Sequence, residues 1–148
     1  MARGLELNVE VRGALELVRA ADRLVERAEP EIRDQARDVA EDLADRIRAA
    51  GRASSRQSAR AAATMRVEEA TFPSVTAGPH PLLFGSEFGA WGRFGWYGLN
   101  RYYGSIGRQF RPHTNDGYWF FPTYYANLPW LVDHWEDVVN ELLRDWPR

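Results

Sequence analysis

Histidines and carboxylates are the side chains of this chain that could hold a metal ion, and they are widely scattered. The three histidines are His80, His113 and His134, and no pair has the compact spacing of a motif such as HExxH. The absence of cysteine excludes a thiolate metal site and a cysteine nucleophile. Carboxylates that could join the histidines are equally dispersed, namely Glu87, Asp116, Asp133 and Glu136. We therefore expect no metal and no other cofactor.

Catalytic groups are similarly weakly supported. The run Asp133-His134-Trp135-Glu136 offers acid–base groups, but adjacent helical positions point in different directions. Ser54, Ser55 and Ser58 lack the GxSxG context of a nucleophile elbow. A dinucleotide-binding loop follows a strand and opens a helix. The glycines of 89–95 do not have this context. We expect no catalytic residues and a protein that is not an enzyme.

The unusual chemistry lies in the aromatic stretch, Phe84 to Tyr125. It holds 15 of the 19 aromatic residues and eight of the 12 glycines, but only six formal charges. Aromatics interleaved with arginines can stack on a saccharide or single-stranded nucleic acid, or anchor a protein interface. They can also fill the core of their own domain. We expect a mixture of core and interface, with ligand stacking as the alternative.

We place the contact with other subunits in the middle of this stretch, between Trp91 and Phe110. Tyr118 to Tyr125 is expected to pack the final helix onto the sheet. The predicted interface residues are Glu87, Phe88, Trp91, Arg93, Phe94, Trp96, Tyr97, Arg101, Tyr102, Tyr103, Arg108 and Phe110.

Charge and hydropathy limit the remaining functions. The formal net charge is −2, and both halves of the chain are nearly balanced, which argues against tight binding to a nucleic-acid backbone. No apolar run reaches 18 residues, and charges interrupt the amino-terminal segment that a signal peptide would occupy. We expect a soluble protein with no membrane span.

Hydrophobic periodicity predicts the elements that position these residues. Alternation from Leu5 to Val11 predicts a strand, and a first helical pattern covers 14–28. A second helix can start at Pro30, and its apolar stripe extends from Ile32 to Ile47. Gly51 is expected to end that helix, and 51–60 reads as a polar linker or mobile loop.

Beyond the linker, 61–77 predicts a β-hairpin or two short strands, with Pro73 at a strand end. Helical spacing returns over 122–146, with a kink or restart at Pro129. We expect one α+β domain over 1–148, in which a long N-terminal helix and a C-terminal helix pack on a small antiparallel sheet. Its parts are a strand and long helix (1–51), a hairpin (61–77), an aromatic insertion loop (84–121) and a C-terminal helix (122–146).

The order of these elements resembles the tail-completion and head-tail joining (neck) proteins of long-tailed bacteriophages. Phe84-Gly85-Ser86-Glu87-Phe88-Gly89 looks like the Glu-Phe-Gly signature of that family, here expected as a turn. Tyr118-Trp119-Phe120-Phe121-Pro122 looks like its aromatic-proline step into the last helix. The chain departs from the pattern by placing Trp91 to Gly117 between the two motifs, where relatives keep a brief connection.

The resemblance implies a ring-forming, non-enzymatic virion protein of the neck, assembled in the host cytoplasm. It implies a hexameric homo-oligomer in contact with the adjacent head-tail connector and with tail terminator or tail tube proteins. DNA would pass through the lumen without sequence-specific binding. The rival hypothesis is a binding module whose aromatic and arginine side chains stack on a saccharide or single-stranded nucleic acid.

Overall fold

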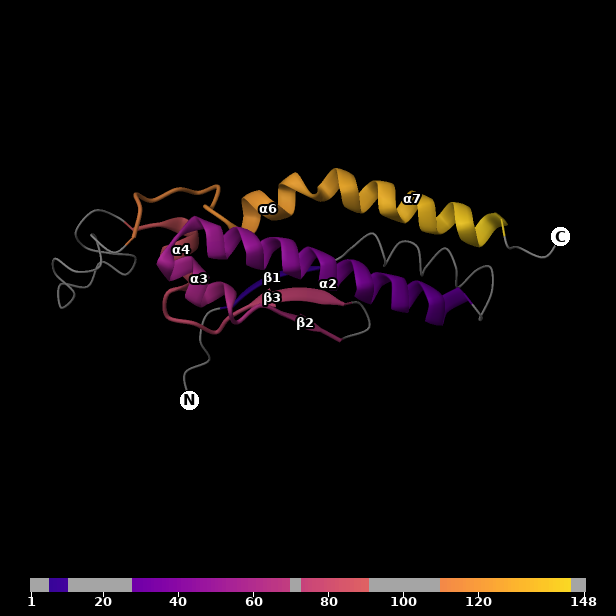
Figure 1. Cartoon of the computed structure of the whole chain (residues 1–148), viewed down its shortest axis with the longest axis horizontal. Helices are drawn as coiled ribbons and strands as arrows, with labels where there is room; N and C mark the ends of the chain where they lie inside the picture. The colour runs from indigo at the N-terminus through magenta and orange to yellow at the C-terminus, as the bar shows by residue number, and fades with distance from the viewer. Residues whose placement is uncertain (1–5, 11–27, 70–72, 91–109, 145–148) are drawn as a thin grey trace.

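The computed structural model describes residues 6–10, 28–69, 73–90 and 110–144, and it confirms an α+β fold. One long helix, α2 (Ala28–Ser54), lies at its centre (Figure 1). Strands β2 and β3 lie on one side of α2, and helices α6 and α7 run along the other side (Figure 1). The remaining elements are β1 (Leu7–Glu10), α3 (Arg56–Ala62), β2 (Arg66–Glu68), β3 (Ser74–Ala77), α4 (Leu83–Phe88), α6 (Phe120–Ala126) and α7 (Leu128–Arg144).

Helix α2 supplies a large share of the core, as its apolar periodicity predicted. Pro30 lies in its first turn, where the missing N–H costs nothing. The stripe on its buried face is at most 1% exposed at every position, namely Ile32, Ala36, Val39, Ala40, Leu43, Ala44 and Ile47. The stripe extends over four turns. Along this length α2 contacts both the sheet and the C-terminal helices.

The sheet has three antiparallel strands in the order β1-β3-β2. Its register places Val9 and Val67 on either side of Val75, so their side chains share the face that packs on α2. The predicted first strand is confirmed, and the hairpin predicted over 61–77 is confirmed as β2 and β3, but Ala61 and Ala62 end helix α3 and do not join the hairpin. Pro73 directly precedes β3, which is the strand-end position expected for it.

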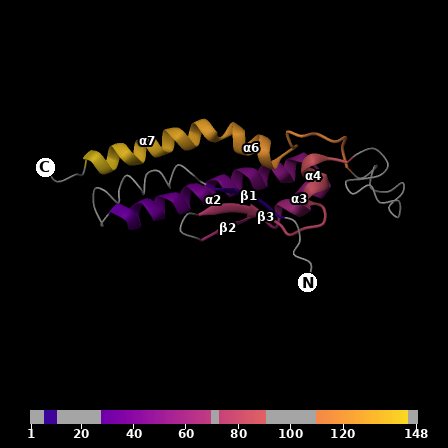
Figure 2. The same cartoon turned by 180° about the vertical axis from the view of Figure 1, so that it is seen from behind.

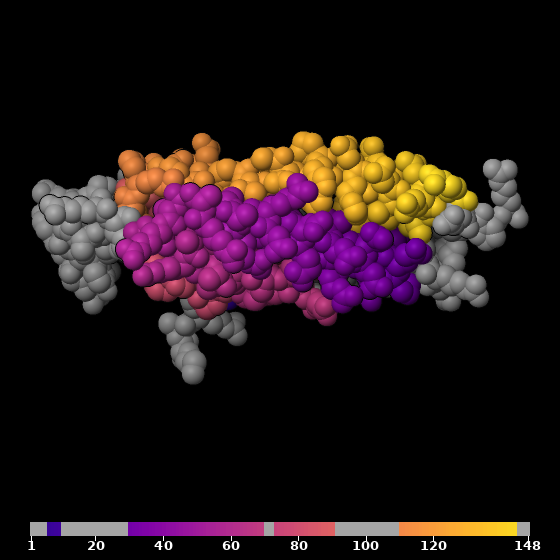
Figure 3. Space-filling model, viewed as in Figure 1, coloured from indigo at the N-terminus to yellow at the C-terminus, as the bar shows by residue number. Residues whose placement is uncertain are grey.

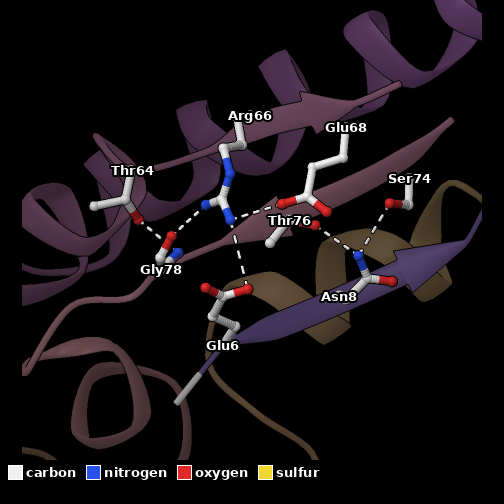
Figure 4. A network of polar contacts seen from close by, with 8 residues as sticks. All are labelled: Glu6, Asn8, Thr64, Arg66, Glu68, Ser74, Thr76 and Gly78. Atoms are coloured by element: carbon white, nitrogen blue, oxygen red, sulfur yellow. Dashed lines mark hydrogen bonds and ion pairs between the residues drawn. The ribbon is translucent and has the colours of Figure 1, made fainter. Parts of the chain in front are cut away.

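The other face of the sheet carries a polar network (Figure 4). Asn8 Nδ2 donates to Ser74 Oγ at 3.0 Å and to Thr76 Oγ1 at 2.6 Å. The Arg66 guanidinium pairs with Glu68 at 2.7 Å and also donates to the Gly78 carbonyl. The bonds of Asn8 join β1 to β3, and the bond of Arg66 to Gly78 joins β2 to the residue that follows β3.

The predicted linker over 51–60 is wrong, because this segment is helical. Helix α2 continues to Ser54, and Ser55 then caps α3 through reciprocal bonds with Ser58. Gly51 does not end a helix but lies buried within α2. A Cβ there would approach Ala62 Cβ at 2.6 Å and the Trp119 ring at 2.8 Å, so this glycine allows α3 and Trp119 to pack closely.

The C-terminal helical region divides at Asn127 into α6 and α7, and the restart expected at Pro129 is confirmed. Both helices pack mainly along α2, so Tyr118 to Tyr125 does not join the last helix to the sheet as expected. Figure 3 shows α7 side by side with α2 over much of the described surface. Only part of the predicted apolar stripe is buried: Leu131, Trp135 and Val138 face inward. Among the described helices, none is long and apolar enough to cross a membrane.

Candidate interaction site at the junction of α4 and α6

A buried carboxylate organises the junction between α4 and α6. Glu87, in the last turn of α4, is 0% exposed. Its Oε2 accepts hydrogen bonds from the backbone N–H groups of Trp119 at 3.0 Å and Phe120 at 2.8 Å. Its Oε1 accepts from the N–H of Phe121 at 2.9 Å. Glu87 therefore satisfies three donors at the start of α6, where helical N–H groups have no partner within the helix.

This position corrects two expectations for the Phe84–Gly89 motif. The motif forms most of a short helix and not a simple turn, and Glu87 lies inside the subunit, where it cannot touch a neighbour. Ser86 shares the buried position: its Oγ accepts from Trp119 Nε1 at 3.3 Å and donates to the Leu83 carbonyl at 2.9 Å.

Two glycines allow close packing at this junction, one against the carboxylate and one against the Phe110 ring. Gly117 has φ +87°, and a Cβ there would lie 2.0 Å from Glu87 Oε1. Gly85 lies under Phe110, whose ring would be 2.5 Å from an added Cβ. Phe110, predicted at an interface, is therefore half-buried against α4.

Backbone hydrogen bonds hold the segment after Phe110 against the end of α4. The N–H of Ala90 donates to the Arg111 carbonyl at 2.9 Å, and the N–H of Thr114 donates to the Phe88 carbonyl at 2.9 Å. Gly89 permits this approach with φ +73°. The Arg111 guanidinium lies 3.8 Å from the centre of the Tyr118 ring. The hydrogen bonds of Ala90 with Arg111 and of Thr114 with Phe88 join the chain before 91–109 to the chain after it. We call these two bonds the backbone clasp.

A ladder of rings leads from this junction to the surface. Phe88 and Phe121 have ring centroids 5.9 Å apart, and Phe121 stacks on Tyr125 at 6.3 Å. Phe121 is also in edge contact with the fully buried Phe120 at 5.2 Å. Phe120 confirms that part of the aromatic stretch fills the core, and Tyr125 is 61% exposed; the expected interface role of the stretch stays a prediction.

An open groove of about 510 Å³ lies beside the exposed end of this ladder. Rings and a proline form its apolar wall, and an amide and a carboxylate supply polar groups. Its lining residues are Phe88, Asn115, Asp116, Phe121, Pro122 and Tyr125. Such a wall can accept a flat apolar face or a sugar ring, while the polar pair can orient hydroxyl or cationic groups.

No protein-family model, curated protein or solved structure matches this chain. The likeness to phage neck proteins therefore stays a prediction, and the functional argument depends on the geometry of this junction and of the surface near it.

Most of the predicted interface residues fall outside the described part of the chain. Of the others, Glu87 is in the core, whereas Phe88 and Phe110 are half-buried at the junction. The predicted contacts without a described position are Trp91, Arg93, Phe94, Trp96, Tyr97, Arg101, Tyr102, Tyr103 and Arg108.

The histidines occupy three separate places. His80 Nδ1 accepts from the N–H of Leu82 at 3.1 Å, and His113 Nε2 bonds with Asn115 Oδ1 at 3.0 Å. The His134 ring lies between Trp130 and Trp135, with centroid distances of 6.0 and 5.9 Å. Among the residues that the structure describes, no three His, Cys, Asp or Glu side chains form a group that could hold a metal ion.

Sequence reasoning missed the role of Glu87 as a helix cap. The available signal was a lone carboxylate among apolar residues in Phe84-Gly85-Ser86-Glu87-Phe88, where burial demands hydrogen-bond donors. Its partners lie 32 to 34 positions later in the chain, so local spacing could not identify them.

Proposed function

We propose that this chain is a non-enzymatic structural protein of a phage virion. In this proposal it forms a ring that acts as a tail-completion or head-tail connector component and joins the tail to the head-proximal complex. The order of elements and the two aromatic motifs support the proposal by resemblance. The structural observation that carries it is a row of exposed apolar side chains on α6 and α7.

This apolar row consists of Tyr125, Leu128, Val132 and Leu143. Their exposed fractions are 61%, 36%, 55% and 61%, and the row begins at the wall of the groove. Several large apolar side chains exposed on the same two helices are a feature that can mark a protein contact. A neighbouring subunit would remove the row from water, and each buried Å² would contribute about 25 cal/mol.

The proposed assembly is a homo-oligomeric ring, with six subunits implied by the resemblance. Its neighbours would be the adjacent head-tail connector and the tail terminator or tail tube proteins, and its location would be the neck of the virion. DNA would pass through the lumen without sequence-specific contacts. A net charge of −2 suits passage of DNA better than tight binding to it.

Assembly gives the direct test of this proposal. We expect the purified full chain, alone or mixed with tails that lack it, to give rings in negative-stain micrographs and a multiple of the subunit mass in light scattering. Replacing Trp91, Phe94 and Trp96 together by Ser should impair assembly while the helical circular-dichroism signal remains. A chain that stays monomeric and also fails to join tails would contradict the proposal.

The groove favours one alternative function, the binding of a saccharide. The rings of Phe121 and Tyr125 offer a stacking face, and Asn115 and Asp116 can bond hydroxyl groups. Single-stranded nucleic acid fits this groove less well, because Asp116 would repel its phosphates and no arginine is among the described residues that line the groove.

Calorimetric titration with neutral oligosaccharides tests this alternative. If the groove binds a sugar, the full chain should release or absorb heat on titration, and Tyr125→Ala should weaken binding about tenfold or more by removing one stacking face. Leu143→Ala, at the far end of the apolar row, is the matched control and should leave that affinity unchanged. No heat with any oligosaccharide would exclude this function.

A further inference from the structure

Positive charge is concentrated at the corner where α2 meets α3. Residues 46–67 contain six arginines and no acidic residue. Three of them have partners inside the subunit. Arg46 donates to Asn127 Oδ1 at 2.7 Å, Arg48 pairs with Asp45, and Arg66 pairs with Glu68.

The other three arginines form a surface that we call the basic corner: Arg52, Arg56 and Arg60. All three are exposed, and none forms a hydrogen bond or ion pair with a described residue. Three unpaired guanidinium groups within nine positions produce a local positive potential that the overall charge of −2 conceals.

Helix α7 carries the opposite charge. Asp133, Glu136, Asp137 and Glu141 are exposed, and none pairs with a cation among the described residues. The basic residue of α7 is Arg144, in its last turn. Glu136 lies four positions after Val132 and seven before Leu143, so helical spacing places this acidic face beside the apolar row.

The two charged surfaces cannot meet within one subunit. Helix α3 lies on the same side of α2 as β2 and β3, whereas α7 lies on the opposite side, and both views agree (Figures 1 and 2). A contact between the basic corner and α7 therefore requires two copies of the chain. Each copy would then use one surface to contact the next subunit and the other to contact the previous one.

We propose that the basic corner of one subunit docks on the acidic face and apolar row of α7 in the next. This inference rests on the proposed ring and adds two described surfaces to the subunit contact predicted between Trp91 and Phe110. Two different surfaces on each copy make a head-to-tail interface, which forms a closed ring when the rotation between subunits closes. Charge complementarity fixes the orientation, and burial of Val132 and Leu143 supplies the apolar contribution.

Paired charge-reversal variants test this interface. One variant replaces Arg52, Arg56 and Arg60 by Glu, and the other replaces Asp133, Asp137 and Glu141 by Arg. We expect each variant alone to associate about tenfold or more weakly than the wild type, because like charges then face each other. An equimolar mixture should regain assembly, because the reversed corner of one variant then faces the reversed α7 of the other, and the two unchanged surfaces face each other, with opposite charge in both contacts.

A third variant controls for the change in net charge. Replacing Asp38, Glu41 and Asp42 by Arg alters the charge of exposed positions on α2 by the same amount and should leave assembly intact. Circular dichroism checks that every variant folds. Should a reversal variant unfold, the wild type supplies a second measurement. Its association should weaken as ionic strength rises from about 10 mM to about 1 M, where the Debye length shrinks from about 30 to about 3 Å.

The outcomes separate this inference from the proposed function. Rings that form equally well from both reversal variants and at every ionic strength would overturn the interface and leave the ring intact. Loss of assembly in each variant without recovery in the mixture would also overturn the interface. A wild-type chain that never assembles, alone or with tails, would overturn both.

Discussion

Replacing Glu87 by Gln is expected to lower the free energy of unfolding by about 2–3 kcal/mol, although the side chain keeps its shape. The carboxylate accepts three backbone N–H groups in a site that is 0% exposed. A glutamine has one carbonyl oxygen, so its amide NH2 group must face at least one of these donors. The change therefore leaves a buried N–H unsatisfied and opposed by another donor.

Urea denaturation followed by circular dichroism measures this effect. Glu41→Gln is the matched control, because Glu41 is exposed on α2 and its replacement should change stability by less than about 0.5 kcal/mol. A similar change in both variants would show that the Glu87 carboxylate does not stabilise the start of α6.

Replacing Gly117 by Ala should destabilise the chain by about 2–4 kcal/mol, since two costs combine at this position. The backbone has φ +87°, which side chains with a Cβ rarely adopt, and the new methyl group would lie 2.0 Å from Glu87 Oε1. To relieve that overlap, the carboxylate must move away from the N–H groups of Trp119, Phe120 and Phe121. Thermal denaturation of the variant measures the combined cost.

A double-mutant cycle with Glu87→Ala separates the two costs. In the Glu87→Ala background no carboxylate remains to be displaced, so Gly117→Ala should cost only about 1 kcal/mol for its backbone conformation. Equal costs in both backgrounds would mean that the close approach to Glu87 contributes nothing.

Hydrophobic periodicity correctly predicted the helices and strands that bury one face. The stripe from Ile32 to Ile47 specified α2, and the alternation of Leu7 and Val9 with polar neighbours specified β1. Local sequence predicts these elements because the buried face needs an apolar residue at each turn of a helix and at every second residue of a strand. The division of the last helix was also predictable from Pro129.

Segment 51–60 was misread because its residues are individually poor signals for a core helix. Ser55 and Ser58 suggested a polar linker, yet they form the reciprocal cap of α3. Gly51 suggested the end of α2, yet its missing side chain makes room for Ala62 and Trp119. The cap is local to Ser55 and Ser58, whereas the role of Gly51 depends on neighbours that lie 11 and 68 positions away in the sequence.

The candidate site was predicted in part. The prediction that rings of the aromatic stretch fill the core is confirmed by Phe120, whereas the predicted interface stays a prediction. The near-neutral charge of each half, however, concealed the separation of Arg52, Arg56 and Arg60 from the acidic residues of α7. A net charge summed over the sequence does not show where the positive and negative charges lie, because helices far apart in space contribute to the same total.

The backbone clasp makes the connection between α4 and α6 a natural place to change the length of the chain. Ala90 is bonded to Arg111, and Phe88 to Thr114, so the two ends of the intervening segment are fixed next to each other whatever its length. The entropy cost of closing a loop whose ends already meet grows slowly with loop length, by about 0.6 kcal/mol for each doubling. Insertions, deletions or an epitope tag between these ends should thus leave the helices and the sheet folded, which gives evolution and the experimenter a position where new segments can be exchanged.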